Sequence, residues 1–314
     1  VSKSSLARAN QDRDYHIFEE YAYYLVSEAR QKCANHIFKL GGNVYAFDST
    51  TIDLCLSVFW WAKFRKKKGG IKVHTLYDVE TQIPAFFHIT EASVHDSKVM
   101  IEIPYEPSSY YIFDRGYSNF KMLYKIHQIE AYFVVRAKKN LGYKSIQWKR
   151  RLPKNVLSDA SVLLTGFYPK QYYPEPLRLV KYWDEEQERE FIFITNAMHI
   201  SALQVAELYK NRWQVELFFK WLKQHLKIKR FWGTTENAVR IQIYAAICAY
   251  CLVAIIQHDM QLDRSTYEVL QILSISLTDK TYLRDLFNKT KFQNDKERFR
   301  PNGPNLFNLN SATL

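Results

Sequence analysis

The order of apolar and turn-rich segments predicts an α/β fold built on a mixed sheet. Three observations lead to this prediction. Short apolar runs typical of strands alternate with helix-like segments between residues 43 and 141. Two of these runs, 71–78 and 84–91, are joined by a short polar turn that fits a hairpin. Two others, in "YAFDST" and "IFDRGY", each deliver an aspartate, Asp48 and Asp114, at the end of a strand.

The chain is expected to begin with a helical segment at residues 1–42, where apolar residues recur at helical spacing up to Gly41-Gly42. Val1 in the place of Met indicates that a segment upstream is missing. Residues 43–141 follow as the first part of the core, in the order strand, strand, strand, helix, strand, helix, strand. The two helices are expected at "HDSKVMIEI" and about 118–128, and the last strand at "AYFVVRAKK".

Residues 142–196 differ from the rest in their pattern. Four short alternating runs, broken by Pro, Gly and charge clusters, predict a β-rich insertion. Residues 197–259 then form the second part of the core, with one helix at about 199–227 and an apolar helix at about 236–258. The tail, 260–314, is polar and weakly patterned, and its end is expected to be mobile.

Neither a membrane span nor a disulfide framework is expected. The apolar run 241–256 is shorter than the roughly 20 residues that cross a bilayer, so a buried core helix explains it better. The first twenty residues are charged throughout, unlike a signal peptide. Cys33 and Cys55 stand alone, and Cys248 and Cys251 lie within the apolar run, where two small buried side chains explain them better than zinc.

The charge balance favours a polyanionic partner. Lys and Arg outnumber Asp and Glu by 44 to 32, which gives a net charge of +12. Nucleic acid is the commonest partner for such a surface, although charge alone is weak evidence.

One stretch, "YKNRWQVELFFKWLK", carries a polar stripe on an otherwise apolar helix. The stripe begins at Tyr209 and continues at Arg212, Glu216 and Lys223, which follow Tyr209 by three, seven and fourteen positions. At about 100° per residue these positions fall within an arc of roughly 60°. A helix apolar on most other sides is largely buried, so the stripe faces a cleft or, alternatively, is a solvated row of charge pairs.

Three carboxylates from separate elements form the candidate catalytic site. Asp48 and Asp114 end strands, and Glu216 lies on the striped helix. Carboxylates brought together need a cation to neutralise them, and hard oxygen ligands suit Mg²⁺ or Mn²⁺. Two such ions activate a water and clamp a phosphodiester. Each acid alone also fits a turn or cap role, and the rival carboxylates are Asp53, Asp78 and Glu91.

These motifs together resemble the IS4-type DDE transposases of bacterial insertion sequences. The resemblance rests on Asp48 in "YAFDST", Asp114 in "IFDRGY" and a Y-x2-R-x3-E-x6-K helix, and covers roughly residues 1–258. It implies an RNase H-like mixed sheet with flanking helices, interrupted by a β-rich insertion domain between the second Asp and the Glu.

The resemblance also assigns roles. Asp48, Asp114 and Glu216 become the metal-binding catalytic triad, with two Mg²⁺ ions or Mn²⁺ as a substitute. Tyr209, Arg212 and Lys223 become contacts to DNA phosphates. Trp213 and one tryptophan of the insertion, Trp148 or Trp183, are expected to stack on an extruded base, although a tryptophan is more often simply part of the core.

The implied function is metal-dependent cut-and-paste transposition. A strand is hydrolysed at the element end, a hairpin forms and is reopened, and the end is joined to target DNA. The implied partners are the terminal inverted repeats, target DNA and a second copy of the chain, in the bacterial cytoplasm and nucleoid. The alternatives are a structure-selective RNase H-like nuclease and a non-catalytic DNA-binding derivative.

Three further stretches have two readings each. "KFRKKK" (63–68) and "RAKK" (136–139) lie in or beside loops near strand ends. Each is expected either to contact DNA phosphates or to be a solvated basic loop. His95-Asp96 either supports the site or caps a helix.

Overall fold

The computed structural model describes residues 2–34, 38–65, 68–225, 231–264, 266–276 and 281–289. The chain divides into two compact units. We call the first the sheet unit (36–80 and 84–216) and the second the helical unit (1–35, 81–83 and 217–314).

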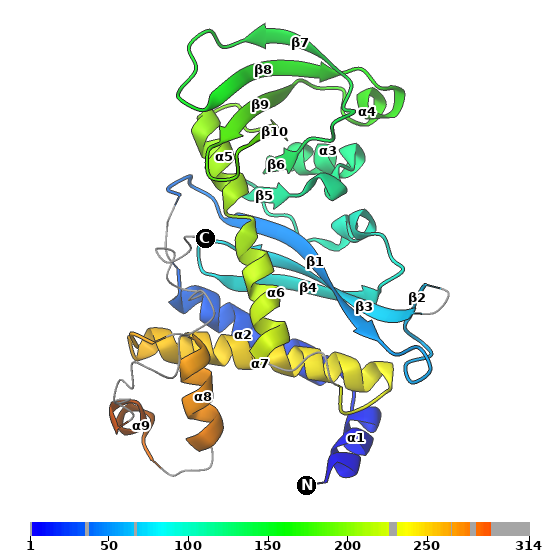
Figure 1. Cartoon of the computed structure of the whole chain (residues 1–314), viewed down its shortest axis with the longest axis vertical. Helices are drawn as coiled ribbons and strands as arrows, with labels where there is room; N and C mark the ends of the chain where they lie inside the picture. The colour runs from blue at the N-terminus through cyan, green and yellow to red at the C-terminus, as the bar shows by residue number, and fades with distance from the viewer. Residues whose placement is uncertain are drawn as a thin grey trace. The chain divides into compact units, whose positions relative to one another are not determined.

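The described strands form one ten-stranded sheet (Figure 1). Its order is β2-β3-β1-β5-β6-β10-β9-β8-β7, and β4 pairs with β3. β3 runs antiparallel to β1, whereas β1, β5 and β6 are parallel. The mixed sheet of an α/β fold that the sequence predicts is therefore confirmed. The strands are β1 (Val44–Leu54), β2 (Lys63–Arg65), β3 (Lys68–Asp78), β4 (Ile83–Glu91), β5 (Tyr110–Phe113), β6 (Tyr132–Arg136), β7 (Tyr143–Trp148), β8 (Val156–Leu164), β9 (Leu177–Asp184) and β10 (Arg189–Thr195).

Asp48 does not end its strand, contrary to the prediction. β1 continues to Leu54, because Thr50, Thr51 and Ile52 favour a strand and pair antiparallel with β3. What ends at Asp48 is the parallel pairing of β1 with β5, whose last registered pair is Phe47 with Phe113.

The segment 142–196 is rich in strands, as predicted, but it continues the central sheet instead of forming a separate domain. β7, β8, β9 and β10 pair antiparallel in succession, and β10 pairs with β6 from Phe193 with Arg136 to Thr195 with Val134. The physical reason is that β10 is apolar on both faces. Phe191, Phe193 and Ile194 are all buried, which is typical of a strand in the interior of a covered sheet and not of an exposed edge. We call β7–β10 the meander.

Short helices complete the sheet unit: η1 (Asp96–Glu102), η2 (Arg115–Tyr117), α3 (Phe120–Gln128), α4 (Phe167–Tyr172), α5 (Ala202–Lys210) and the start of α6 (Trp213–His225). Aromatic and aliphatic side chains from β1, β5, β6 and α3 form its core, including Phe47, Phe113, Leu123 and Phe133.

The striped helix is two helices rather than one. α5 ends at Lys210 and α6 begins at Trp213. Asn211 causes the break, because its side chain donates to the Glu207 carbonyl oxygen and accepts from Gln214. Such local hydrogen bonds compete with the helical ladder.

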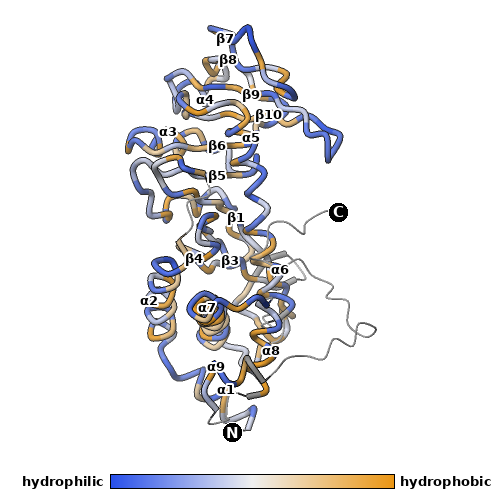
Figure 2. Tube along the Cα trace, turned by 90° about the vertical axis from the view of Figure 1, so that its left-hand side faces the viewer, coloured by the Kyte–Doolittle hydropathy of each residue, from blue (hydrophilic) through white to orange (hydrophobic). Residues whose placement is uncertain are grey.

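The helical unit contains α1 (Lys3–Asp12), α2 (His16–Lys32), α7 (Glu236–Asp259), α8 (Thr266–Ser276) and α9 (Leu283–Lys289), together with the remainder of α6. α7 is long and apolar enough to cross a membrane, and Figure 2 colours much of it as hydrophobic. However, 61% of its most apolar window is buried, which agrees with the predicted core helix. Cys248 and Cys251 are among its buried side chains.

The tail is more structured at its start than the sequence suggests. α8 and α9 occupy part of 260–314, because Val269, Ile272 and Phe287 pack with Val253 of α7. The predicted mobile end of the tail, from residue 290, lies outside the described residues.

Candidate active site

The register of the parallel strands brings Asp48 and Asp114 side by side. Phe47 of β1 pairs with Phe113 of β5, and each aspartate is the next residue along its strand. Both side chains are half-buried, and that of Asp48 is 21% exposed. Two carboxylates therefore leave neighbouring strands at the same level, as the sequence predicts for a shared site.

Arg212 joins two members of the predicted triad. It lies in the turn between α5 and α6, and its side chain is only 15% exposed. Its Nη1 atom lies 2.6 Å from Asp48 Oδ2, and its Nη2 atom lies 2.5 Å from Glu216 Oε1. Asp48 and Glu216 thus converge on one positive group, although they come from a strand and a helix 168 positions apart in numbering.

Tyr209 contacts the third carboxylate. Its hydroxyl donates to Asp114 Oδ1 at 2.9 Å. Its ring lies 5.8 Å from that of Phe191 and 4.7 Å from that of Phe193, measured between centroids. The meander therefore forms part of the wall behind Tyr209. In this structure Tyr209 and Arg212 both contact carboxylates of the triad, and their predicted role as phosphate contacts stays a prediction.

Burial and crowding of charge shape the electrostatics of the site. The pKa of Asp48 is raised to about 6, mainly by burial and also by the charges of Glu216 and Asp114, while Arg212 and the Ser49 N–H oppose the rise. Burial would lower the pKa of Arg212, but the charges of Asp48, Tyr209 and Glu216 hold it above its usual range. Arg212 is therefore a fixed positive charge. Burial, with the charge of Asp114, raises the pKa of Tyr209 to about 12, so its hydroxyl stays protonated and donates.

The donor set fits a hard divalent cation. The triad supplies carboxylate oxygens alone, which Mg²⁺ and Mn²⁺ prefer. Two of these carboxylates already bind a single cationic group, Arg212. In the described part of the chain, no three His, Cys, Asp or Glu side chains are close enough to form a complete metal-binding group.

The rival carboxylates have other surroundings. Asp53 and Glu91 are exposed. Asp78 is buried, and its Oδ1 accepts the Glu80 N–H, as in a turn. None of the contacts described above involves these three residues.

The other predicted DNA contacts are distributed over both units. Lys223 lies on α6 in the helical unit and is half-buried. Trp213, at the start of α6, is 56% exposed, Trp148 of β7 is 63% exposed and Trp183 of β9 is 39% exposed. All three tryptophans thus present surface, and their stacking role stays a prediction.

Of the two basic stretches, "KFRKKK" and "RAKK", only the second has side chains that the structure describes. The side chains of 63–68 lie outside the described residues. In "RAKK", Arg136 follows Val135, which pairs with Phe113, and its guanidinium carbon lies 5.0 Å from the centroid of the Phe191 ring. Lys138 and Lys139 are exposed.

Two supporting residues were missed by sequence reasoning. Ser49 follows Asp48 and donates its hydroxyl to Asp96, so the "His95-Asp96" pair reaches the site through its second member. Tyr117, three residues after Asp114 in "IFDRGY", places its hydroxyl 3.5 Å from Asp48 Oδ1. The position of Tyr117 in the motif was the available signal. His95 caps η1 by accepting the Ser97 N–H.

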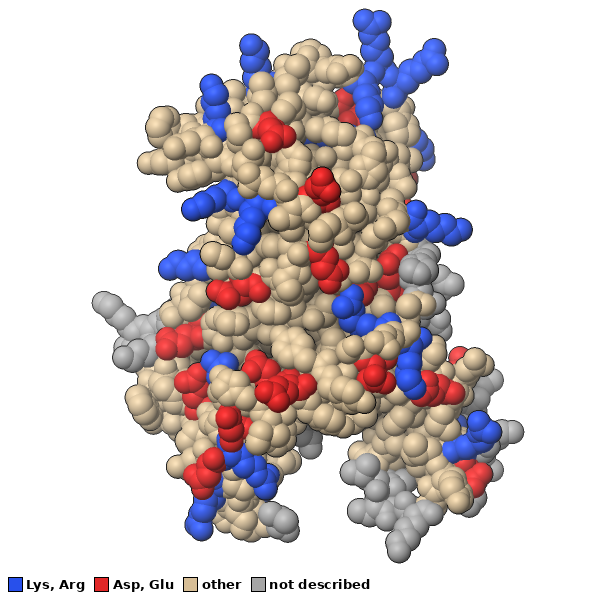
Figure 3. All heavy atoms as spheres, turned by 180° about the vertical axis from the view of Figure 1, so that it is seen from behind, with Lys and Arg blue, Asp and Glu red and all other residues tan. Residues whose placement is uncertain are grey.

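Positive side chains stand out from the surface that carries the meander (Figure 3). The connection between β7 and β8 contributes an exposed basic run, Lys149, Arg150, Arg151 and Lys154. Such a surface suits a phosphate backbone.

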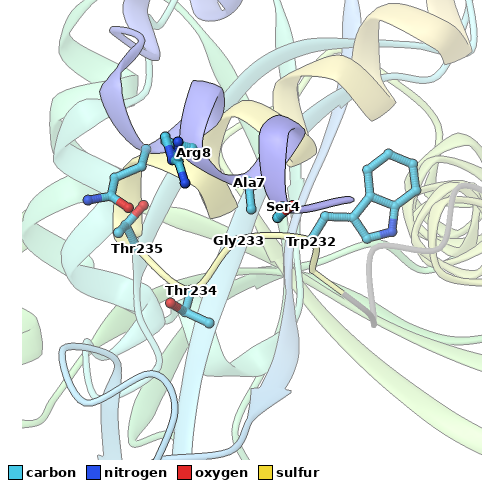
Figure 4. Close-up of a pocket in the computed structure, with 8 residues that line it drawn as sticks. Ser4, Ala7, Arg8, Trp232, Gly233, Thr234 and Thr235 are labelled. Carbon is cyan, nitrogen blue, oxygen red and sulfur yellow. The ribbon is translucent and has the colours of Figure 1, made fainter. Parts of the chain in front are cut away.

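A cavity of about 300 Å³ lies in the helical unit, between α1 and the segment that leads to α7 (Figure 4). Arg8, Trp232, Thr234 and Thr235 line it, and no residue of the triad does so.

A family model of the transposase DDE domain matches residues 39–252, which include all three carboxylates. The chain belongs to this family. Its function class is DNA transposition, carried out by an enzyme that cuts and joins DNA.

Named relatives agree with this assignment. The chain is 36% identical over 246 residues to the putative transposase y4zB of Sinorhizobium fredii, covering 76% of this chain and 67% of that protein. It is 27% identical over 249 residues to the probable transposase for insertion sequence element IS5377 of Geobacillus stearothermophilus, covering 79% and 66%. It is also 25% identical over 303 residues to the putative transposase for IS4SA of Synechocystis, covering 91% and 82%.

A solved piggyBac transposase synaptic complex with hairpin DNA is 12% identical, with a TM-score of 0.45, and the match covers 78% of this chain and 56% of that one. The chain spans about two thirds of the length of the first two relatives.

Proposed function

We propose that this transposase performs cut-and-paste transposition at the site formed by Asp48, Asp114 and Glu216, with Mg²⁺ as the metal. The observation that carries the proposal is the convergence of Asp48 and Glu216 on one cationic group, with Asp114 beside Asp48 on the neighbouring strand. The three carboxylates would hold the metal ions. Bound ions would supply an activated water and stabilisation of the leaving oxygen.

The chain's own cations and hydroxyls would position the DNA. Arg212 lies within 2.6 Å of the Asp48 carboxylate, so a phosphate that it binds would lie next to that carboxylate. Tyr209 occupies the corresponding place at Asp114. Lys223 is proposed as a third phosphate contact. Positioning dominates phosphoryl transfer, so these groups act on rate through geometry.

The proposed reaction has three stages. Water attacks at the element end and frees a 3′-OH. That hydroxyl attacks the opposite strand and gives a hairpin, which is reopened before the end is joined to target DNA. The proposed assembly contains two copies of the chain on the terminal inverted repeats, in the bacterial cytoplasm and nucleoid. The net charge of +12 supports the DNA partner.

The deciding experiment is incubation with candidate element ends and Mg²⁺, scored for nicks, hairpins and joined products. Asp48→Asn and Asp114→Asn should each abolish cleavage, since each removes an anionic ligand without changing volume. Asp53→Asn is the matched control, because Asp53 is an exposed aspartate on the same strand. Nicks without joined products would indicate a structure-selective nuclease. DNA binding with no nicks at all would indicate a non-catalytic derivative.

A second experiment separates the metal ligand from the phosphate contacts. Glu216→Gln should lose every chemical step by several powers of ten. Tyr209→Phe, Arg212→Ala and Lys223→Ala should retain part of first-strand hydrolysis and lose more of hairpin formation, which needs the 3′-OH held in line. The measurement is the ratio of nicked to hairpin product with time. Equal loss of both steps in Lys223→Ala and Glu216→Gln would contradict this division of roles.

A further inference from the structure

The two oxygens of the Asp48 carboxylate have different surroundings: one accepts a hydrogen bond from the backbone, and the other faces a cationic group. Its Oδ1 atom accepts the Ser49 N–H at 2.8 Å, and the Tyr117 hydroxyl lies 3.5 Å from the same oxygen. Its Oδ2 atom faces Arg212 at 2.6 Å. The side chain is therefore tied to its own strand through Oδ1, which leaves Oδ2 for whatever cation occupies the site.

Asp96 holds Ser49, the residue whose N–H binds Asp48 Oδ1. Asp96 begins η1, and its Oδ1 accepts the Ser49 hydroxyl at 2.8 Å. The same oxygen lies 3.0 Å from Lys72 Nζ, whose side chain is only 13% exposed and also donates to the Val94 carbonyl oxygen at 2.7 Å. A half-buried ion pair thus anchors the serine next to the proposed catalytic aspartate.

The strand register explains why these groups meet. Ser49 of β1 pairs with His74 of β3, and Lys72 lies two positions away on the same face of β3. His74 is fully buried, and its Nδ1 atom lies 3.9 Å from Asp96 Oδ1. Burial lowers the pKa of His74 to about 4, so His74 is neutral and Lys72 supplies the positive charge that Asp96 needs.

We infer that Asp96 is a positioning residue, which sets the orientation of the Asp48 carboxylate toward the metal through the Ser49 hydroxyl. This inference rests on the proposed function, because it takes Asp48 as a metal ligand. Asp96 contacts Ser49, and none of its contacts described above is to Asp48, Asp114 or Glu216. Partners that orient a metal ligand in this way change metal affinity or activity by about 10–100-fold when they are removed.

The test compares the metal requirement of paired variants. Ser49→Ala and Asp96→Asn break the link, whereas Ser49→Thr keeps the hydroxyl on a residue suited to a strand. Asp53→Asn is the control for a lost carboxylate on β1. The first readout needs no DNA: it is the Mn²⁺ concentration that gives half of the maximal rise in melting temperature. The second is the Mg²⁺ concentration for half-maximal cleavage, compared with the maximal rate.

We expect Ser49→Ala and Asp96→Asn to raise both half-maximal concentrations about tenfold or more. Their maximal rates should fall less, and Ser49→Thr and Asp53→Asn should stay close to wild type. A merely structural role would lower the melting temperature without changing the metal requirement, and that result would overturn the inference. So would equal effects of Ser49→Ala and Ser49→Thr.

Asp48→Asn separates this inference from the proposed function. If Asp48→Asn keeps the wild-type response to Mn²⁺, the proposed triad is wrong. If Asp48→Asn loses the response while Asp96→Asn and Ser49→Ala retain it, only the positioning role of Asp96 is wrong.

Discussion

Replacing Arg178 with Met tests whether the meander sets the position of the helix that carries Tyr209. Arg178 lies on β9, and its side chain is only 3% exposed. Its Nε and Nη2 atoms each donate to Asp159 of β8 at 2.7 Å. Its Nη1 atom donates to the carbonyl oxygens of Ala197 at 3.3 Å and Ile200 at 2.5 Å, in the segment that leads into α5. One guanidinium therefore ties two strands to the start of that helix.

The expected loss of stability follows from the groups that Met leaves unpaired. The Asp159 side chain is 4% exposed, and its remaining partner is Lys149 Nζ at 3.1 Å, on a side chain that is 57% exposed. Removing one partner of a buried ion pair costs about 3–5 kcal/mol. Each carbonyl group left without a donor adds about 1 kcal/mol. We expect Arg178→Met to lower the free energy of unfolding by about 5–7 kcal/mol.

The double variant Arg178→Met/Asp159→Leu should lose only about 2 kcal/mol, because no buried charge is left unpaired. Lys149→Met is the control and should lose less than about 1 kcal/mol, since its ammonium group is exposed. Urea unfolding followed by circular dichroism measures all three. DNA cleavage by Arg178→Met should also fall, at temperatures where it remains folded, because the Tyr209 contact to Asp114 loosens. A double variant as unstable as the single one would refute the reasoning.

Three other predictions concern the backbone, pH and salt. Gly42→Ala should lower the free energy of unfolding by about 2–3 kcal/mol, measured by thermal unfolding, because the added Cβ would lie 2.0 Å from the Ser108 carbonyl oxygen. The control is Gly116→Ala, whose Cβ would meet nothing within 4 Å and which should cost much less stability. Equal losses in the two variants would contradict this prediction. The folded-state pKa of His74 is lowered from 6.5 to about 4, so the unfolded chain binds the extra proton first and stability should fall by up to about 3 kcal/mol as the pH drops through that window. His74→Gln should remove this part of the pH dependence, and an unchanged curve would count against it. Log DNA affinity should fall with log salt by about 0.9 per neutralised phosphate, and a flat dependence would exclude backbone binding by the basic surface.

The clustering of the three candidate carboxylates could be predicted because their signals are local. Asp48 and Asp114 each follow an apolar run of four residues, and the helix motif fixes the spacing of Tyr209, Arg212 and Glu216. The break at Asn211 was not predictable, because all three residues continue helical spacing across it. That break matters, since Arg212 reaches Asp48 from a turn and not from a helix face.

Pairings between distant parts of the chain set the limit of sequence reasoning. The strand-like character of 189–195 is visible in "REFIFIT", but nothing in it shows that β10 pairs with β6, more than 50 positions earlier. Asp96 resembled a helix cap in sequence, and only the fold brings it to Ser49, 47 positions away. Such contacts depend on the register of β1 with β3.

The strands of the meander follow one another across the sheet in the order β10-β9-β8-β7, and of these four strands only β10 pairs with β6. Evolution can therefore lengthen or shorten its outer end without disturbing the strands that hold the aspartates. The same arrangement offers an engineering site. The connection between β7 and β8 is exposed at residues 151–153 and belongs to the outermost hairpin, so a foreign module inserted there should leave the carboxylate site intact.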